Sequence, residues 1–143
     1  MVRIYIAGPL FCDSEKEYNI KLAEALRTAG YEVILPQEST PSFDSARMCE
    51  STYAQDVAEI ICRDDLTLID GCDILVFNLD GRVPDEGACV ELGYAHAKGL
   101  RTFAIKTDIR VSEFGIDNMM IAGIVGKRTA RSIPELLEML KAQ

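Results

Sequence analysis

The chain alternates short apolar runs with longer amphipathic segments. The apolar runs have the length and composition of buried strands, and they occupy residues 2–7, 31–35, 74–77, 101–105 and a brief stretch between 124 and 130. The amphipathic segments have helical spacing, and they occupy residues 13–29, 50–69, 85–95, 115–121 and a last stretch that opens at 132–135. Strands that alternate with helices predict an α/β fold with a parallel sheet and right-handed crossovers.

Local signals mark several of the predicted helix ends. Asp13 or Ser14 can cap the first helix, and Gly30 stops it. Ser132 is the expected cap of the last helix, with Pro134 in its first turn. Each of these residues agrees with the periodicity, so we expect the elements to begin and end near them.

Residues 37–49 are polar and turn-rich, and they are too many for a bare connection in so short a chain. Loops of this length are usually functional or mobile. The chain has 143 residues, which suits a single core, and no linker or internal repeat interrupts it. We therefore expect one domain over residues 1–143.

The most specific stretch is DEGACVELGYA at residues 85–95. It follows a buried strand and a polar link, so it should open a helix at the carboxyl end of a strand, where open α/β sheets bind ligands. On that helix Glu91 lies among Gly87, Ala88, Tyr94 and Ala95, at spacings of three and four residues. We predict that a bulky ligand can pack against this face of mostly small groups.

A plainer interpretation of the same stretch is that Asp85 is only an N-cap and Glu91 only a solvated helix charge. Asp85 and Glu86 do lie at the positive end of the predicted helix, where negative charge is stabilised. However, Val90, Leu92 and the neighbours of Glu91 make this helix apolar nearly all round. That pattern favours a functional carboxylate at Glu91.

Composition narrows the class of partner. The formal net charge of −8 disfavours a nucleic-acid polymer or an anionic membrane surface, so a small ligand is favoured. The five cysteines form no CxxC pair, and with the lone His96 they offer no zinc spacing. No signal-peptide pattern is present, and no apolar run approaches the roughly 18 residues of a membrane span. We expect a cytoplasmic protein with reduced thiols.

Several kinds of chemistry lack their motifs. The sequence has no GxxxxGK[ST], and residues 8–11 lack the later glycines of a dinucleotide fingerprint. There is no GxSxG, and His96 is expected to be a helix-end residue. Carboxylate chemistry is left, with Asp64, Asp65, Asp85 and Glu91 as candidates. Acids that share one pocket can attack an acetal carbon and protonate the leaving group, which breaks a glycosidic bond.

Three blocks of the sequence together resemble the nucleoside 2-deoxyribosyltransferase family. They are IYIAGPLF at residues 4–11, DDLTLIDGCDILVF at 64–77 and DEGACVELGYA at 85–95, in the family's order and spacing. The resemblance covers most of the chain. It implies a single-domain, doubly wound, flavodoxin-like fold with helices on both faces of a five-stranded parallel sheet. It also implies an enzyme of nucleoside salvage that moves 2-deoxyribose between nucleobases with no cofactor and no metal.

The resemblance also implies roles for individual residues. Glu91 would attack the anomeric carbon and hold the sugar as a covalent ester, and Tyr5 would orient that carboxylate. Asp65 would contact the base and supply its proton, with Asp64 a poorer match for this role. Asp85 would bind the sugar hydroxyls.

Further residues would complete the substrate pocket. Gly8, Phe11 and Gln37 would lie against the substrate, although Gln37 can equally be a plain loop residue. Family members assemble as dimers and larger oligomers, in which Asn118 would reach into the neighbouring site. The expected partners are deoxynucleosides, free nucleobases and further copies of the chain.

Two rival functions stay open. The first is an N-glycosidase of the same superfamily that hydrolyses a nucleoside or a nucleoside 5′-monophosphate. Its phosphate-binding version would need serines or an arginine in the first loop, and residues 7–13 contain neither. The second is a non-catalytic nucleotide sensor, against which the coincidence of Tyr5, Asp65, Asp85 and Glu91 argues. The sequence leaves open whether pyrimidines are accepted as well as purines, and how strictly ribose is rejected.

Overall fold

The computed structural model describes residues 1–39, 42–111 and 115–142. Its centre is a parallel sheet of five strands, namely β1 (Arg3–Ala7), β2 (Glu32–Ile34), β3 (Ile74–Asn78), β4 (Arg101–Ile105) and β5 (Thr129–Ala130). The strands lie in the order β2-β1-β3-β4-β5, and every neighbouring pair is parallel. This order is that of a doubly wound, flavodoxin-like sheet, which confirms the predicted fold class.

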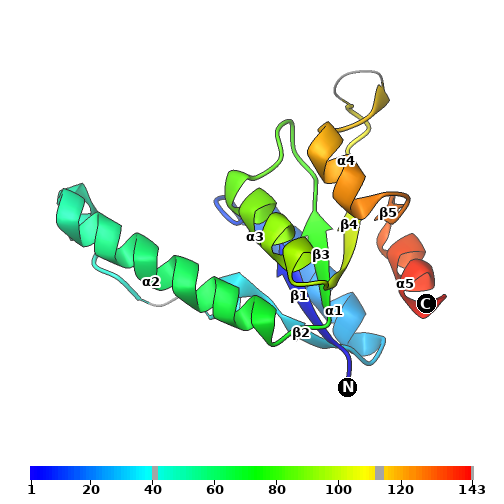
Figure 1. The fold of residues 1–143 in the computed structure, drawn as a ribbon, viewed down its shortest axis with the longest axis horizontal. Coiled ribbons are helices and arrows are strands. Elements are labelled where there is room, and N and C mark those ends of the chain that lie inside the picture. Colours follow the sequence, from blue (N-terminus) through cyan, green and yellow to red (C-terminus); the bar gives the residue numbers. More distant parts are fainter. Residues whose placement is uncertain (40–41, 112–114, 143) are drawn as a thin grey trace.

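Helices cover both faces of the sheet (Figure 1). One face carries α1 (Asp13–Thr28) and α5 (Ile133–Lys141), and the other carries α2 (Ser51–Asp70), α3 (Glu86–Ala97) and α4 (Met119–Val125). Successive side chains of a strand point to opposite faces. Ile4 and Ile6 of β1 therefore join the core under α1 and α5, whereas Tyr5 and Ala7 join the core under α3. This alternation turns Tyr5 toward the helix that carries Glu91.

Some of the predicted helix ends are confirmed. Gly30 follows the last turn of α1 with φ of +93°, a conformation that L side chains rarely adopt. The Ser132 hydroxyl caps α5 by accepting a hydrogen bond from the backbone N–H of Glu135 at 3.3 Å. These two residues fix the ends of the two helices on the same face of the sheet.

The predicted cap of α1 is wrong. The helix begins at Asp13, so Asp13 and Ser14 both lie inside its first turn rather than before it. The carboxylate of Glu15 instead reaches back and accepts hydrogen bonds from the backbone N–H groups of Phe11 at 2.8 Å and Cys12 at 3.1 Å. Because this glutamate satisfies the amides that precede the helix, no polar cap from Asp13 or Ser14 is needed.

The short helix expected at 115–121 lies further along the chain, at Met119–Val125. Asn118 caps it, with Oδ1 accepting from the N–H groups of Met120 at 2.9 Å and Ile121 at 3.4 Å. A side chain that satisfies two otherwise unpaired helix donors sets the start of the helix at that residue. The predicted brief strand follows as β5.

The first half of α2 extends away from the sheet as an arm (Figure 1). It packs against a short 3-10 helix, η2 (Ser45–Cys49), where the Tyr53 hydroxyl accepts from the Asp44 N–H at 2.9 Å and the Arg47 guanidinium lies 4.2 Å from the Tyr53 ring centroid. Ile69, near the other end of α2, is fully buried, but Ile60 is 40% exposed. The helical period was therefore predicted correctly, and part of the apolar stripe of α2 lies outside the core of the sheet.

The loop expected at 37–49 joins β2 to this arm. It contains η2 and most of a second 3-10 helix, η1 (Pro36–Glu38). Residues 40–41 lie outside the described part of the chain.

Candidate active site

The candidate site is built on a hydrogen bond between β1 and α3. Tyr5 is fully buried in the middle of β1, and its hydroxyl donates to Oε1 of Glu91 at 2.6 Å. Glu91 lies in the middle of α3, with Gly87 and Ala95 one turn to either side. The structure thus brings together two residues that the sequence placed in one site.

Glu91 is poised between two ionisation states. Burial raises the pKa of Glu91 to about 7, because the charged carboxylate loses solvation. The hydrogen bond from Tyr5 acts in the opposite direction, since it stabilises the charged form, and the charges of Asp65 and Asp85 raise the pKa further. Burial, followed by the charge of Glu91, raises the pKa of Tyr5 well above its usual range. At neutral pH Tyr5 is therefore a donor, while Glu91 is present both as acid and as carboxylate.

Asp65 is the second carboxyl group of the site. It lies on the sheet-proximal half of α2, and it is half-buried. Burial raises the pKa of Asp65 above its usual range, and the charge of Asp64 adds to this effect. Asp64 itself pairs with Arg63 at 3.1 Å on the surface. Of the two aspartates, Asp65 is the one whose charge raises the pKa of Tyr5 and of Glu91. A raised pKa suits Asp65 to donate a proton.

Asp85 contributes from the start of α3. Its Oδ1 accepts a hydrogen bond from the N–H of Ala88 at 2.7 Å, so Asp85 is the N-cap of this helix. Its charge also raises the pKa of Glu91, so Asp85 acts electrostatically on the proposed nucleophile. The capping role that the plainer interpretation gave to Asp85 is thus real, and a role in binding sugar hydroxyls stays a prediction.

Gly8 follows β1 at the carboxyl edge of the sheet. A Cβ at this position would lie 2.7 Å from Cβ of Asn78, at the end of β3, so the close approach of the two segments requires glycine. Phe11, three residues later, is 77% exposed. Its ring is available for contact with a ligand, and that contact stays a prediction.

Gln37 uses its amide within the chain. Its Nε2 donates to the carbonyl of Lys16 at 3.1 Å, and its Oε1 accepts from Nδ2 of Asn19 at 3.2 Å. Both partners belong to α1. In this arrangement Gln37 joins the segment after β2 to α1. Its contact with a base stays a prediction.

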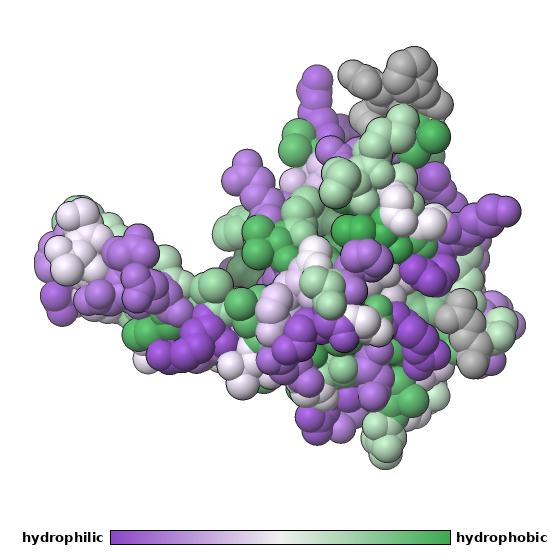
Figure 2. Space-filling view, in the orientation of Figure 1, coloured by the Kyte–Doolittle hydropathy of each residue, from purple (hydrophilic) through white to green (hydrophobic). Residues whose placement is uncertain are grey.

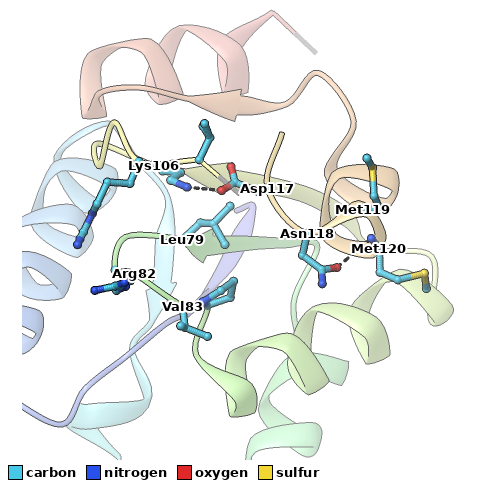
Figure 3. Close-up of a pocket in the computed structure, with 12 residues that line it drawn as sticks. Leu79, Arg82, Val83, Lys106, Asp117, Asn118, Met119 and Met120 are labelled. Carbon is cyan, nitrogen blue, oxygen red and sulfur yellow. Dashed lines mark hydrogen bonds and ion pairs between the residues drawn. The ribbon is translucent and has the colours of Figure 1, made fainter. Parts of the chain in front are cut away.

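An open cavity of ≈ 930 Å³ lies at the carboxyl ends of β3 and β4 (Figure 3). Lys106 is only 4% exposed there, and its ammonium group forms an ion pair with Asp117. The described residues that line this cavity come from the loop after β3, the segment after β4 and the start of α4: Leu79, Gly81, Arg82, Val83, Pro84, Lys106, Arg110, Val111, Asp117, Asn118, Met119 and Met120. Tyr5, Asp65 and Glu91 are not among them. This cavity therefore adjoins the loop before Asp85 rather than the Tyr5–Glu91 pair.

Asn118 lies on the other side of α3 from Glu91. It lines a second, mostly apolar cavity of ≈ 540 Å³ together with Cys89, Leu92 and Gly93 of α3. On a helix these three positions form a stripe that points away from Glu91. Figure 2 shows hydrophobic side chains gathered around α3 and α4. Within one chain Asn118 and Glu91 therefore lie on different sides of α3.

Two polar arrangements were missed from the sequence. One is the ion pair of Lys106 and Asp117, and the other is a buried amide pair formed by Asn19 and Asn78, in which Nδ2 of Asn78 donates to Oδ1 of Asn19 at 2.9 Å. The available signal was a polar residue directly after an apolar strand, which describes both Asn78 and Lys106.

Within the described ranges, no group of three or more His, Cys, Asp or Glu side chains could hold a metal ion. No described helix is long and apolar enough to span a membrane.

Known proteins share this architecture. The family model described as Nucleoside 2-deoxyribosyltransferase matches residues 4–125. Among solved structures, a conserved protein from Enterococcus faecalis V583 has a TM-score of 0.79 at 28% identity, with 99% of this chain and 98% of that chain covered. No curated protein sequence gives a significant match.

Two characterised enzymes have the same fold at lower identity. A 2-deoxyribosyltransferase from Bacillus psychrosaccharolyticus has a TM-score of 0.76 at 20% identity, with 95% of this chain and 90% of that chain covered. The CMP N-glycosidase BcmB from Clostridium botulinum has a TM-score of 0.56 at 19% identity, with 97% and 98% covered. At these identities the two enzymes establish the fold, which is common to a transferase and a hydrolase.

Proposed function

Since this chain belongs to the nucleoside 2-deoxyribosyltransferase family, we propose that it moves 2-deoxyribose from one nucleobase to another through a covalent ester on Glu91. The observation that carries the proposal is the 2.6 Å hydrogen bond from Tyr5 to Glu91, beneath a helix that carries the family's DEGACVELGYA block. A nucleophilic carboxylate must be held in one orientation, and a buried phenol that stays protonated does this.

The proposed reaction has two displacements. Glu91 attacks the anomeric carbon as the base departs, and this inverts the configuration there. A second base then attacks the glycosyl ester and inverts it again, so the product has the β configuration of the donor. Asp65 donates a proton to the departing base and takes one from the incoming base, for which its raised pKa is suited.

The substrate is held around this pair. Asp85, which is already fixed as the cap of α3, binds the sugar hydroxyls. Gly8 allows the first loop to pass close to β3, and Phe11 presents an exposed ring beside it for the base. The two bonds of Gln37 to α1 use one N–H and one lone pair of its amide, which leaves a second N–H and a second lone pair for contact with the base.

The complete site requires a second copy of the chain. Asn118 lies across α3 from Glu91 within one chain, so its proposed contact with a substrate is made in a neighbouring subunit. The arm supplies a surface for association, because Phe43, Met48 and Ile60 are exposed on it or beside it. We infer a homo-oligomer in which each site borrows Asn118 from its partner.

A hydrolase is the second candidate. The fold is shared with a CMP N-glycosidase, and Phe11, which was expected to lie against the substrate, is exposed in the single chain. Water that reaches the glycosyl ester would release free sugar in place of a new nucleoside. The same Glu91 chemistry serves both outcomes, so only the fate of the ester distinguishes them.

A chromatographic assay tests the proposal. Deoxyinosine is supplied as donor and adenine or cytosine as acceptor, with wild type and Glu91→Gln compared. A new deoxynucleoside that is formed by wild type alone supports transfer and the role of Glu91. Hypoxanthine without a new nucleoside would identify a hydrolase, and full activity of Glu91→Gln would refute the mechanism.

A further inference from the structure

Two asparagine side chains are buried where the first loop, the second loop and the sheet meet. Asn19 on α1 and Asn78 at the end of β3 are each 2% exposed. Among the described residues, only Thr102 and Lys106 are other polar or charged residues with such burial. A buried primary amide is costly unless its donors and acceptor are bonded, so its partners show what it holds in place.

Asn19 is bonded to three different segments. Its Nδ2 donates to the carbonyl of Pro9 at 2.8 Å and to Oε1 of Gln37 at 3.2 Å, while its Oδ1 accepts from Nδ2 of Asn78 at 2.9 Å. Asn78 in turn accepts from the N–H of Asp80 at 3.2 Å. One side chain thus joins the loop after β1 to the segment after β2 and to the end of β3.

The first loop is also held by close packing. A Cβ on Gly8 would lie 2.7 Å from Cβ of Asn78, so the chain crosses the end of β3 with no room for a side chain. The hydrogen bond from Asn19 holds the carbonyl of Pro9, the residue that follows Gly8. Contact and hydrogen bond together fix the course of the loop three residues beyond Tyr5.

An apolar pair of similar volume could fill this place at little cost in stability, since well-packed hydrophobic groups often replace buried polar groups without loss. Amide groups add direction, because each bond specifies where one segment lies relative to another. The segments joined by Asn19 carry Phe11 and Gln37, the two residues that we propose to contact the base.

We propose that Asn19 is a positioning residue that holds the 8–11 loop and the 36–39 segment in one register over the site, and thereby sets the ratio of transfer to hydrolysis. This inference rests on the proposed function and deepens it. When both bonds from Nδ2 are made, the two segments limit access of water to the glycosyl ester while an acceptor base is bound. When they are lost, the segments move apart and water competes more effectively.

The principal variant is Asn19→Asp, which has nearly the same shape and can still accept from Asn78 but loses both donated bonds. Asn19→Ala removes these two bonds and also the one accepted from Asn78, without a new charge, and it serves if the aspartate prevents folding. The matched control is Thr102→Val, which removes a buried hydroxyl that bonds to the Ile124 carbonyl and lies outside both segments.

Two readouts are measured for each variant. The first is the ratio of free base released to new nucleoside formed, which we expect to rise about tenfold in the Asn19 variants and to stay unchanged in Thr102→Val. The second is amide hydrogen exchange, which should become faster at residues 8–12 and 36–39 together in the Asn19 variants alone. A purely structural role of Asn19 would leave the product ratio of both Asn19 variants at the wild-type value.

The outcomes separate this inference from the proposed function. Unchanged exchange in both segments would overturn the positioning role, and faster exchange with an unchanged product ratio would overturn its link to water. A wild type that forms neither free base nor new nucleoside would refute the proposed function, and with it the proposed control of the product ratio. Hydrogen exchange would still decide whether Asn19 holds the two segments.

Discussion

At the scale of single residues, Glu91 is subject to two opposing influences on its ionisation. Burial and neighbouring acids favour the neutral acid, and the Tyr5 hydroxyl favours the carboxylate. The nucleophile must be the carboxylate, so the active fraction rises as pH increases through the pKa of about 7. We predict that kcat/KM rises with pH across the neutral range.

Tyr5→Phe tests this balance. Loss of the hydroxyl removes the one interaction that lowers the pKa of Glu91, so the pKa rises and the ascending limb of the pH profile moves to higher pH. A hydrogen bond to a charged group is worth about 1.5–3 kcal/mol, which predicts a loss of about tenfold or more at pH 7. The control is Tyr94→Phe, whose hydroxyl on the same helix bonds to Asp70 and not to Glu91. An ascending limb that does not move in Tyr5→Phe would contradict the account.

The pairing of Tyr5 with Glu91 could be predicted from the sequence, because both residues belong to blocks with family-specific spacing. Their ionisation could not, since burial depends on how α2 and α3 cover the sheet. The burial of Asn19 could not be predicted from the sequence, because an asparagine within an amphipathic helix is usually exposed to solvent. Its burial follows from contact with the Pro9 carbonyl and with Asn78, far away in sequence.

At the scale of elements, α3 depends on Asp85 for its start. Asp85→Ala removes the cap and should cost about 1 kcal/mol of stability, measured by chemical unfolding. Asp85→Asn retains the capping oxygen, so we expect near wild-type stability. If the charge also binds the sugar, Asp85→Asn still raises KM or lowers kcat/KM for deoxynucleosides. Full activity of Asp85→Asn would mean that Asp85 is a cap and no more.

Element type was easier to predict than element boundaries. The five strands and the helices between them follow from hydrophobic periodicity alone. The start of α4 shifted because Asn118 supplies a cap, and the cap of α1 differed because Glu15 satisfies the preceding amides. Both depend on the orientation of one side chain, which periodicity does not specify.

At the scale of the whole molecule, the proposal of a shared site starts from the arm and from the position of Asn118. The sequence predicted the helical period of α2 but not its extension beyond the sheet, because an apolar stripe has the same pattern whether or not it packs on the core. Asn118 and Glu91 belong to different sides of α3, so one chain alone does not contain the proposed site.

Mixing two inactive variants tests the shared site. Glu91→Gln lacks the nucleophile, and Asn118→Asp loses the amide donor but retains the oxygen that caps α4. If chains exchange between dimers at random, about a quarter of the sites in the mixture are intact, and activity should recover to that level. Each variant alone is the control. No recovery in a mixture whose chains have exchanged, as verified by native mass spectrometry, would refute the sharing of Asn118.

The covalent intermediate is the central claim, and trapping it is the most direct measurement. Wild type is incubated without acceptor base with a nucleoside whose sugar carries fluorine at C2′, which slows both displacements by destabilising positive charge at the anomeric carbon. Intact mass and peptide mapping should then show one sugar on Glu91, released base in equal amount, and no adduct in Glu91→Gln. Steady release of base with no sugar on any peptide, or a sugar on Asp65 or Asp85 instead, would contradict the account.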